Sequence, residues 1–225
     1  MKIFLLRWLP VLISCILFLS PSLGKSNTGQ WKLISSKDGF ITKRKKVPNS
    51  NIFAFRGETI TDVPIGKIIS VFVDSSTRKN WINMYGGDAD LKVRSELDKT
   101  YWIRFNTPWP TSDRDYVLRS VGSVNESNKT FTCNIQSVNH PKKGEQDCCV
   151  RGMAYGTYYR FQVLPGSNKT KVEVEVHTDP KGWIPAWLTN IIQKKWPRRT
   201  LTSLLKEASK DGVKAHANFK SWNTK

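Results

Sequence analysis

The sequence predicts an α+β fold in which a curved antiparallel sheet wraps around a long C-terminal helix. Two observations support this. Most segments after residue 30 alternate hydrophobic and polar residues, as 172–177 do, and such alternation is typical of strands with one buried face. A long helical pattern then fills about 185–210, after the last strand. Short turns join successive strands, so we expect most of the sheet to be antiparallel.

The strand candidates fall into two groups with helices between them. Asp62 predicts the N-terminal cap of a first helix, which runs to about Asp74. A second short helix or turn carries Arg78 and Trp81. Three strands precede these helices and seven follow them, at 31–36, 40–47 and 52–61, and then at 91–97, 100–106, 115–124, 130–138, 150–155, 157–164 and 171–177.

Three segments divide the chain. Residues 1–24 predict a secretory signal peptide, 25–210 one folded domain and 211–225 a loose C-terminal tail. Within the domain, Pro197 lies inside the final helical pattern. Because proline lacks a backbone donor, we expect it to kink that helix near Lys195.

The composition favours one globular domain with an anionic partner. Of 225 residues, 39% are hydrophobic and 24% are charged, and the net charge is +18. Such a charge suits a phospholipid surface. We find no helix-turn-helix, zinc-finger or RNA-binding signature, so we expect no binding to nucleic acid. We also expect a monomer. The sequence contains no Ser-His-Asp arrangement, phosphate loop or metal-ligand spacing, and we therefore expect neither catalysis, nor a metal, nor a cofactor.

The N-terminal residues predict the compartment. Residues 1–7 contain two basic residues and no acid, 8–19 are apolar apart from Ser14, and 20–24 offer a cleavage site after Gly24. We therefore expect a secreted or periplasmic protein. Two alternatives remain open: an uncleaved anchor, and a lipoprotein in which Cys15 is lipidated.

The remaining cysteines suggest a disulfide. An oxidising compartment permits one bond among Cys133, Cys148 and Cys149. A bond between the adjacent pair would be strained, so we expect Cys133 to pair with Cys148 or with Cys149.

Two segments carry a resemblance to a known family. Residues 107–117, TPWPTSDRDYV, and residues 179–190, DPKGWIPAWLTN, resemble signature segments of the START domain family of lipid-transfer proteins. Residues 150–153 resemble a third, weaker element, and the whole resemblance covers about 31–210. It implies a helix-grip fold, with one lipid enclosed in an elongated cavity between the sheet and the C-terminal helix.

The resemblance also implies which residues line or gate this cavity. On the strand at 100–106, the alternation leaves two sets, of which we expect the apolar one to face inward rather than Trp102, Arg104 and Asn106. The candidates on the strands are Tyr101, Ile103, Phe105, Arg114, Tyr116, Leu118, Tyr159 and Phe161, and those on the helix are Trp187, Leu188, Ile191 and Ile192.

Arg114 has two interpretations. It faces inward and binds a lipid headgroup, or it pairs with a nearby carboxylate and locks the loop to the strand. Sterol-binding members of the family place a buried arginine six residues after this one. Ser120 occupies that position here, which argues against a sterol.

The C-terminal helix also suggests contact with a membrane. Basic residues flank a tryptophan, and a basic helix with an exposed tryptophan suits transient contact with an anionic membrane surface. The alternative is a solvated polar face with the tryptophan buried. The candidates are Lys194, Lys195, Trp196, Arg198 and Arg199.

These observations favour a protein that binds a single lipid and transfers or shields it between membranes. The alternative is an enzyme on the same helix-grip fold, cyclase-like or hydrolase-like, acting on an aromatic or polyketide ligand. An enzyme needs paired polar residues in the cavity, such as Arg114 with Tyr101 or with Tyr159.

Overall fold

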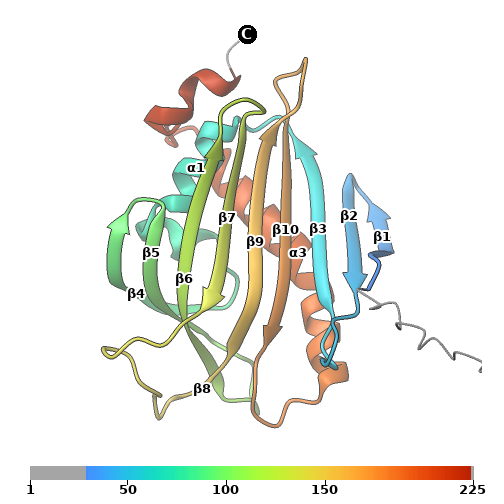
Figure 1. Ribbon diagram of the computed structural model, residues 1–225, viewed down its shortest axis with the longest axis vertical. Coiled ribbons are helices and arrows are strands. Elements are labelled where there is room, and N and C mark those ends of the chain that lie inside the picture. The colour runs from blue at the N-terminus through green and yellow to red at the C-terminus, as the bar shows by residue number, and fades with distance from the viewer. Residues whose placement is uncertain (1–28, 224–225) are drawn as a thin grey trace, which may run out of the picture.

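The computed structural model describes residues 29–223 and shows one strongly curved sheet packed against helices (Figure 1). The predicted signal peptide, with Cys15, lies outside the described residues. Ten strands form the sheet in the order β1-β2-β3-β10-β9-β7-β6-β5-β4, with β8 beside β6. The strands are β1 Lys32–Lys37, β2 Phe40–Lys45, β3 Ala54–Thr61, β4 Tyr85–Ser95, β5 Asp98–Phe105, β6 Asp113–Asn125, β7 Thr130–Ser137, β8 Cys149–Arg151, β9 Met153–Val163 and β10 Thr170–Asp179.

The pairing is antiparallel, as predicted, except that β6 and β8 pair in parallel. Two boundaries differ from the sequence prediction. β9 is one strand rather than two, because Gly156 stays in register opposite His177. β4 begins at Tyr85 rather than at residue 91, because Gly87 is accommodated at a register shift. In both places pairing with neighbouring strands, rather than local residue preference, determines the boundary.

Two α-helices lie between β3 and β4. They are α1 (Ile65–Val73) and α2 (Arg78–Trp81), joined by the short 3-10 helix η1 (Ser75–Thr77). Pro64 rather than Asp62 caps α1, and no side chain closes that cap. Ile65, Ile68 and Ile69 are fully buried, so the helix is held by the packing of its apolar face rather than by capping.

The long helix α3 (Ala186–Ala208) crosses the concave face of the sheet (Figure 1). Its second half is anchored in the core, where Leu201, Leu204 and Ala208 are fully buried. Pro197 packs against β3 at Gly57, where a Cβ would lie 2.6 Å from the proline Cβ. Only glycine permits this approach. The kink predicted at Pro197 stays a prediction.

The C-terminal residues do not form the loose tail that the sequence suggested. They end in the 3-10 helix η2 (Ala217–Asn223), which packs on α1 beside the β6–β7 turn (Figure 1). Phe219 and Trp222 are buried, and the Trp222 indole donates to Glu126 over 3.0 Å. Two aromatic side chains in a lysine-rich segment supply the buried area that orders it. Among the described residues, no helix is long and apolar enough to span a membrane.

Candidate functional site: a cavity beneath the C-terminal helix

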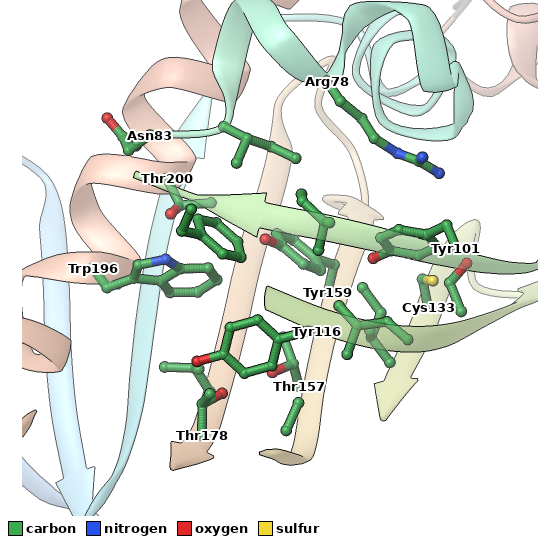
Figure 2. Close-up of a pocket in the computed structure, with 18 of the residues that line it drawn as sticks. Arg78, Asn83, Tyr101, Tyr116, Cys133, Thr157, Tyr159, Thr178, Trp196 and Thr200 are labelled. Atoms are coloured by element: carbon green, nitrogen blue, oxygen red, sulfur yellow. The ribbon is translucent and has the colours of Figure 1, made fainter. Parts of the chain in front are cut away.

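A cavity of about 240 Å³ lies between the concave face of the sheet and α3. Strands β5, β6, β7, β9 and β10 provide one wall, and α1, α2 and α3 provide the other (Figure 2). Two apolar lining residues also reach the surface: Met84 is 43% exposed and Ile192 is 47% exposed. The cavity therefore opens between the α2–β4 connection and the first half of α3.

The sheet wall consists largely of the apolar set that the alternation predicted to face inward. Alternate side chains of β5, β6 and β9 point to the cavity, namely Tyr101, Ile103, Phe105, Tyr116, Leu118 and Tyr159. On the opposite face, the Trp102 indole donates to Asp115 over 2.7 Å. That the six inward-facing side chains contact a lipid stays a prediction.

Phe161 is the exception on this wall. It is fully buried, and its ring packs against the rings of Phe131 and Phe72, with centroid distances of 5.8 Å and 5.4 Å. The expectation that Phe161 lines the cavity is therefore wrong. Phe161 does lie on the inward face of β9, but α1 covers it, so side chains fill this part of the interior and leave no cavity there.

The tyrosines give the cavity neutral polar groups. Burial raises the pKa of Tyr101 and of Tyr116 well above the ordinary value, because the charged form would lose its hydration. Both hydroxyls therefore stay protonated near neutral pH and act as hydrogen-bonding groups.

A charge cluster centred on the buried Arg78, which lines the cavity, was not predicted from the sequence. The Arg78 guanidinium lies 2.6 Å from an Asp88 oxygen and 2.9 Å from an Asp90 oxygen, and its central carbon lies 4.1 Å from the centre of the Tyr101 ring. Burial raises the pKa of Asp90, but a hydrogen bond from Ser75 and the charge of Arg78 together outweigh it, so the pKa lies below its usual value. The alternation of Asp88 and Asp90 on one strand face was the available signal.

The helix wall is more polar than the sheet wall. α3 presents Thr189, Gln193, Trp196 and Thr200 to the cavity, and these residues lie three or four apart, on one face of the helix. Thr189 and Gln193 were missed because threonine and glutamine on a helix suggest a solvated face. Trp196 packs against the hydrophobic core, so its assignment to an exposed membrane-contact surface is wrong.

The apolar residues of the first half of α3 lie differently from the prediction. Trp187 is 64% exposed and Ile191 is 51% exposed, and neither they nor the half-buried Leu188 line the cavity. Of the four predicted helix residues, Ile192 does line it. The prediction assumed that the apolar side faces inward, whereas the polar stripe of the helix faces the cavity here.

Arg114 neither pairs with a carboxylate nor presents a free guanidinium. It is buried at the edge of the cavity and donates to three backbone carbonyls, those of Ser112, Pro180 and Lys181. It thus joins the start of β6 to the turn that leads into α3. Arg114 therefore does lock the loop to the strand, but it does so through backbone carbonyls rather than through a carboxylate. These contacts give no support to the interpretation that Arg114 binds a lipid headgroup.

The disulfide prediction is also wrong. Cys148 and Cys149 form the bonded pair, at the start of β8, and Cys133 is free. Cys133 lies on β7 with its side chain toward the cavity, on the face opposite the loop that carries the pair. Burial raises the pKa of its thiol to about 12.

Comparison with known proteins agrees with this architecture. The START domain model matches residues 20–196, well over half of the chain. The chain belongs to the START domain family. Bovine phosphatidylcholine transfer protein is 26% identical to it over 193 residues, covering 84% of this chain and 85% of that protein. The uncharacterised protein PA1579 of Pseudomonas aeruginosa is 26% identical over 194 residues, covering 83% and 91%.

Solved START domains share the fold. Human StAR-related lipid transfer protein 5 superposes with a TM-score of 0.72 at 19% identity, over 79% of this chain and 86% of that one. A StAR-related lipid transfer protein of Xanthomonas axonopodis gives a TM-score of 0.69 at 22% identity, over 80% and 99%. The helix-grip architecture of this START domain is thereby shown, and lipid binding in general follows from the family.

Proposed function

We propose that this START domain encloses a single membrane lipid in the cavity beneath α3 and carries it between membranes. One observation carries the proposal most directly: an apolar cavity opens to the surface beside Ile192, on the part of α3 that also exposes Trp187 and Ile191. Burying the acyl chains contributes about 0.8 kcal/mol per CH₂ group. The names of the phosphatidylcholine transfer proteins that resemble it support a phospholipid cargo.

The surface around the opening supports docking to a membrane. Trp183, Trp187 and Ile191 are exposed on the turn before α3 and on its first turns, and Trp109 is exposed on the β5–β6 loop. Arg114 ties these two segments together, so they lie at one end of the sheet (Figure 1). Aromatic residues favour the membrane interface. We name Trp183, Trp187 and Ile191 the apolar docking patch.

Basic side chains continue from this patch. Lys194, Lys195 and Arg199 are exposed one to two turns further along α3, where anionic headgroups would attract them. Arg198 instead pairs with Asp38 over 2.8 Å. The membrane-contact proposal therefore keeps Lys194, Lys195 and Arg199, and exchanges Trp196 for the apolar docking patch.

The geometry gives less support to the enzyme alternative. The pairs suggested for that hypothesis were Arg114 with Tyr101 or with Tyr159, but Arg114 donates to backbone carbonyls. Burial raises the pKa of both tyrosines far above neutrality, which makes them poor general bases. We therefore propose a binding protein without catalysis.

A transfer assay tests the proposed function. Purified protein is mixed with donor and acceptor vesicles that can be separated, and phospholipid in the acceptors is measured over time. A Thr157→Trp variant fills the cavity from β9, and Gln162→Trp places the same bulk on the outer face of that strand. We expect transfer by the wild type and by Gln162→Trp and little by Thr157→Trp. Equal transfer by both variants would refute a cavity-borne cargo.

We further propose that residues 1–24 direct export, so that the domain acts in the periplasm or outside the cell. The support is the charge and hydropathy of this segment. N-terminal sequencing of the protein recovered from its natural compartment should begin at Lys25. An intact N-terminus, or a lipid-modified Cys15, would contradict cleavage after Gly24 and indicate a protein anchored to the membrane.

A further inference from the structure

The cavity contains an unusual concentration of buried polar atoms without partners. Across residues 29–223, five buried side-chain nitrogen or oxygen atoms lack a hydrogen-bond partner, and four of them belong to residues that line this cavity: Trp81 Nε1, Asn83 Nδ2, Thr189 Oγ1 and Gln193 Oε1. Buried polar groups are nearly always paired, so each exception needs an explanation. Their collection at a single site points to a polar ligand group.

The four atoms divide by chemistry and by position. Trp81 and Asn83, on α2 and just after it, present N–H donors. Thr189 and Gln193 present oxygens from the first two turns of α3. Thr189 is 2% exposed and Gln193 is 9% exposed. The cavity therefore offers N–H donors from α2 and the connection after it, and oxygen acceptors from α3.

The orientation of the Gln193 amide is determined by its neighbour. Its nitrogen donates to the backbone carbonyl of Thr178 on β10. The opposite orientation would bring two acceptor oxygens together, so the oxygen must be the unpaired end. An amide oxygen accepts hydrogen bonds and cannot donate them. Gln193 therefore requires a partner with an O–H or N–H group.

We propose that the cargo carries such a hydrogen-bond donor, a hydroxyl or an N–H group, and binds with it against Gln193 and Thr189 on α3. This inference rests on the proposed function and narrows its substrate class. Phosphate or ester oxygens of the same lipid suit the N–H groups of Trp81 and Asn83. Phospholipids offer such oxygens whatever their headgroup, so the donor distinguishes one cargo from another.

The prediction separates lipids that have the same charge and acyl chains and differ only by methyl groups on a nitrogen or an oxygen. Phosphatidylethanolamine and phosphatidylcholine are both zwitterionic, but only the former has N–H groups. Diacylglycerol has a hydroxyl that its O-methyl ether lacks. This START domain should prefer phosphatidylethanolamine over phosphatidylcholine, or diacylglycerol over its O-methyl ether, according to which pair its cavity accepts. Binding the lipid without a donor leaves the Gln193 oxygen buried and unpaired.

Competition measured by native mass spectrometry tests this. The full chain is incubated with vesicles that hold equal amounts of dioleoyl phosphatidylethanolamine and dioleoyl phosphatidylcholine, and the two bound masses are compared. Dioleoylglycerol and its O-methyl ether form a second competition. We expect roughly tenfold enrichment of the donor lipid in at least one pair, the factor expected for one hydrogen bond to a buried acceptor. The pair that shows enrichment identifies the donor as N–H or O–H.

Isosteric variants assign the preference to the two residues. Thr189→Val and Gln193→Leu should each reduce the enrichment toward parity. Thr189→Val should not lower the urea midpoint, because the hydroxyl it removes has no partner in the protein. Thr170→Val is the matched control: this buried hydroxyl donates to the Val63 carbonyl over 3.0 Å, so its loss should lower the midpoint and leave the enrichment unchanged.

Three results would overturn the inference. Equal binding within both lipid pairs would refute it and leave the proposed function standing. Enrichment that survives both Thr189→Val and Gln193→Leu would refute the assignment to α3. Protein that binds none of the four lipids would refute the proposed function and the inference together.

Discussion

The two halves of α3 differ in what they bury. From Pro197 onward, the helix packs fully buried leucines against α1 and β3. Before Pro197, it exposes Trp187 and Ile191 to the surface and presents Thr189 and Gln193 to the cavity. The second half therefore anchors the helix. Apart from Trp196, which packs against the core, the first half is held mainly by hydrogen bonds between the side chains of Asn190 and Gln193 and the backbone of neighbouring segments. We expect a segment held in this way to open at a lower free-energy cost than the buried leucines of the second half.

This difference explains how one helix both stabilises the domain and covers a cavity. If α3 were anchored along its whole length, it would have to unfold to admit a lipid. Because α3 is anchored mainly at its C-terminal half, its N-terminal half can move, beside the cavity opening and the apolar docking patch. The predictions below test this division, beginning with the largest expected effect.

A core substitution in the anchoring half should cost the most stability. Leu204 is fully buried, and Leu204→Ala should lower the free energy of unfolding by about 2–5 kcal/mol through lost burial and a cavity. Ile191→Ala in the first half should change it by less than about 0.5 kcal/mol. Urea denaturation of both variants measures this. Equal losses would show that the halves are anchored alike.

The junction between the halves should tolerate no added bulk. A Cβ at Gly57 would lie 2.6 Å from the Pro197 Cβ, so Gly57→Ala should force α3 away from β3 and cost about 1–3 kcal/mol. Gly144→Ala is the control, since nothing lies within 4 Å of its added Cβ. Thermal unfolding compares them. If Gly57→Ala is neutral, the contact does not hold the helix.

The exposed half should matter for membranes rather than for stability. Trp187→Ser with Ile191→Ser should leave unfolding within about 0.5 kcal/mol of the wild type. The same changes should weaken binding to anionic vesicles roughly tenfold, because interfacial aromatic and aliphatic area is lost. Vesicle co-sedimentation measures the binding. Undiminished binding would remove the apolar docking patch from the account.

Acid should lower the free energy of unfolding by a smaller amount, through the ion pair between Asp90 and Arg78. The pKa of Asp90 is lowered, so its contribution is present above the unfolded value near 3.8 and is lost as pH falls through the folded pKa. Asp90→Asn should flatten the stability profile below about pH 4 by roughly 1 kcal/mol or less, since the group is partly solvated. Urea midpoints between pH 3 and pH 7 test this. An unchanged acid slope would contradict it.

The sequence predicted the order of strands and helices because alternation and helical periodicity both report a single buried face. It also placed the inward residues of β5 and β6 correctly, since a strand offers only two faces. Helix α3 was harder. In its first half, Trp187 and Ile191 face outward while Thr189 faces the cavity, which reverses the usual rule. Arg78 and its two aspartates could not be matched without the fold, because strand register brings them together.

The C-terminal segment illustrates the same limit. The sequence suggested a loose tail, whereas Phe219 and Trp222 fix it to the domain. Composition averages over a segment, but two buried aromatic side chains decide whether it is ordered. Likewise, adjacency alone argued against the Cys148–Cys149 bond, whereas the fold pairs these two and leaves Cys133 buried with its side chain toward the cavity.

Native mass spectrometry of the purified full chain, before and after incubation with phospholipid vesicles, tests the central claim most directly. We predict a species whose added mass equals one lipid molecule and which Thr157→Trp abolishes. Protein that stays empty under every loading condition, with Thr157→Trp indistinguishable from the wild type, would contradict a lipid-carrying cavity.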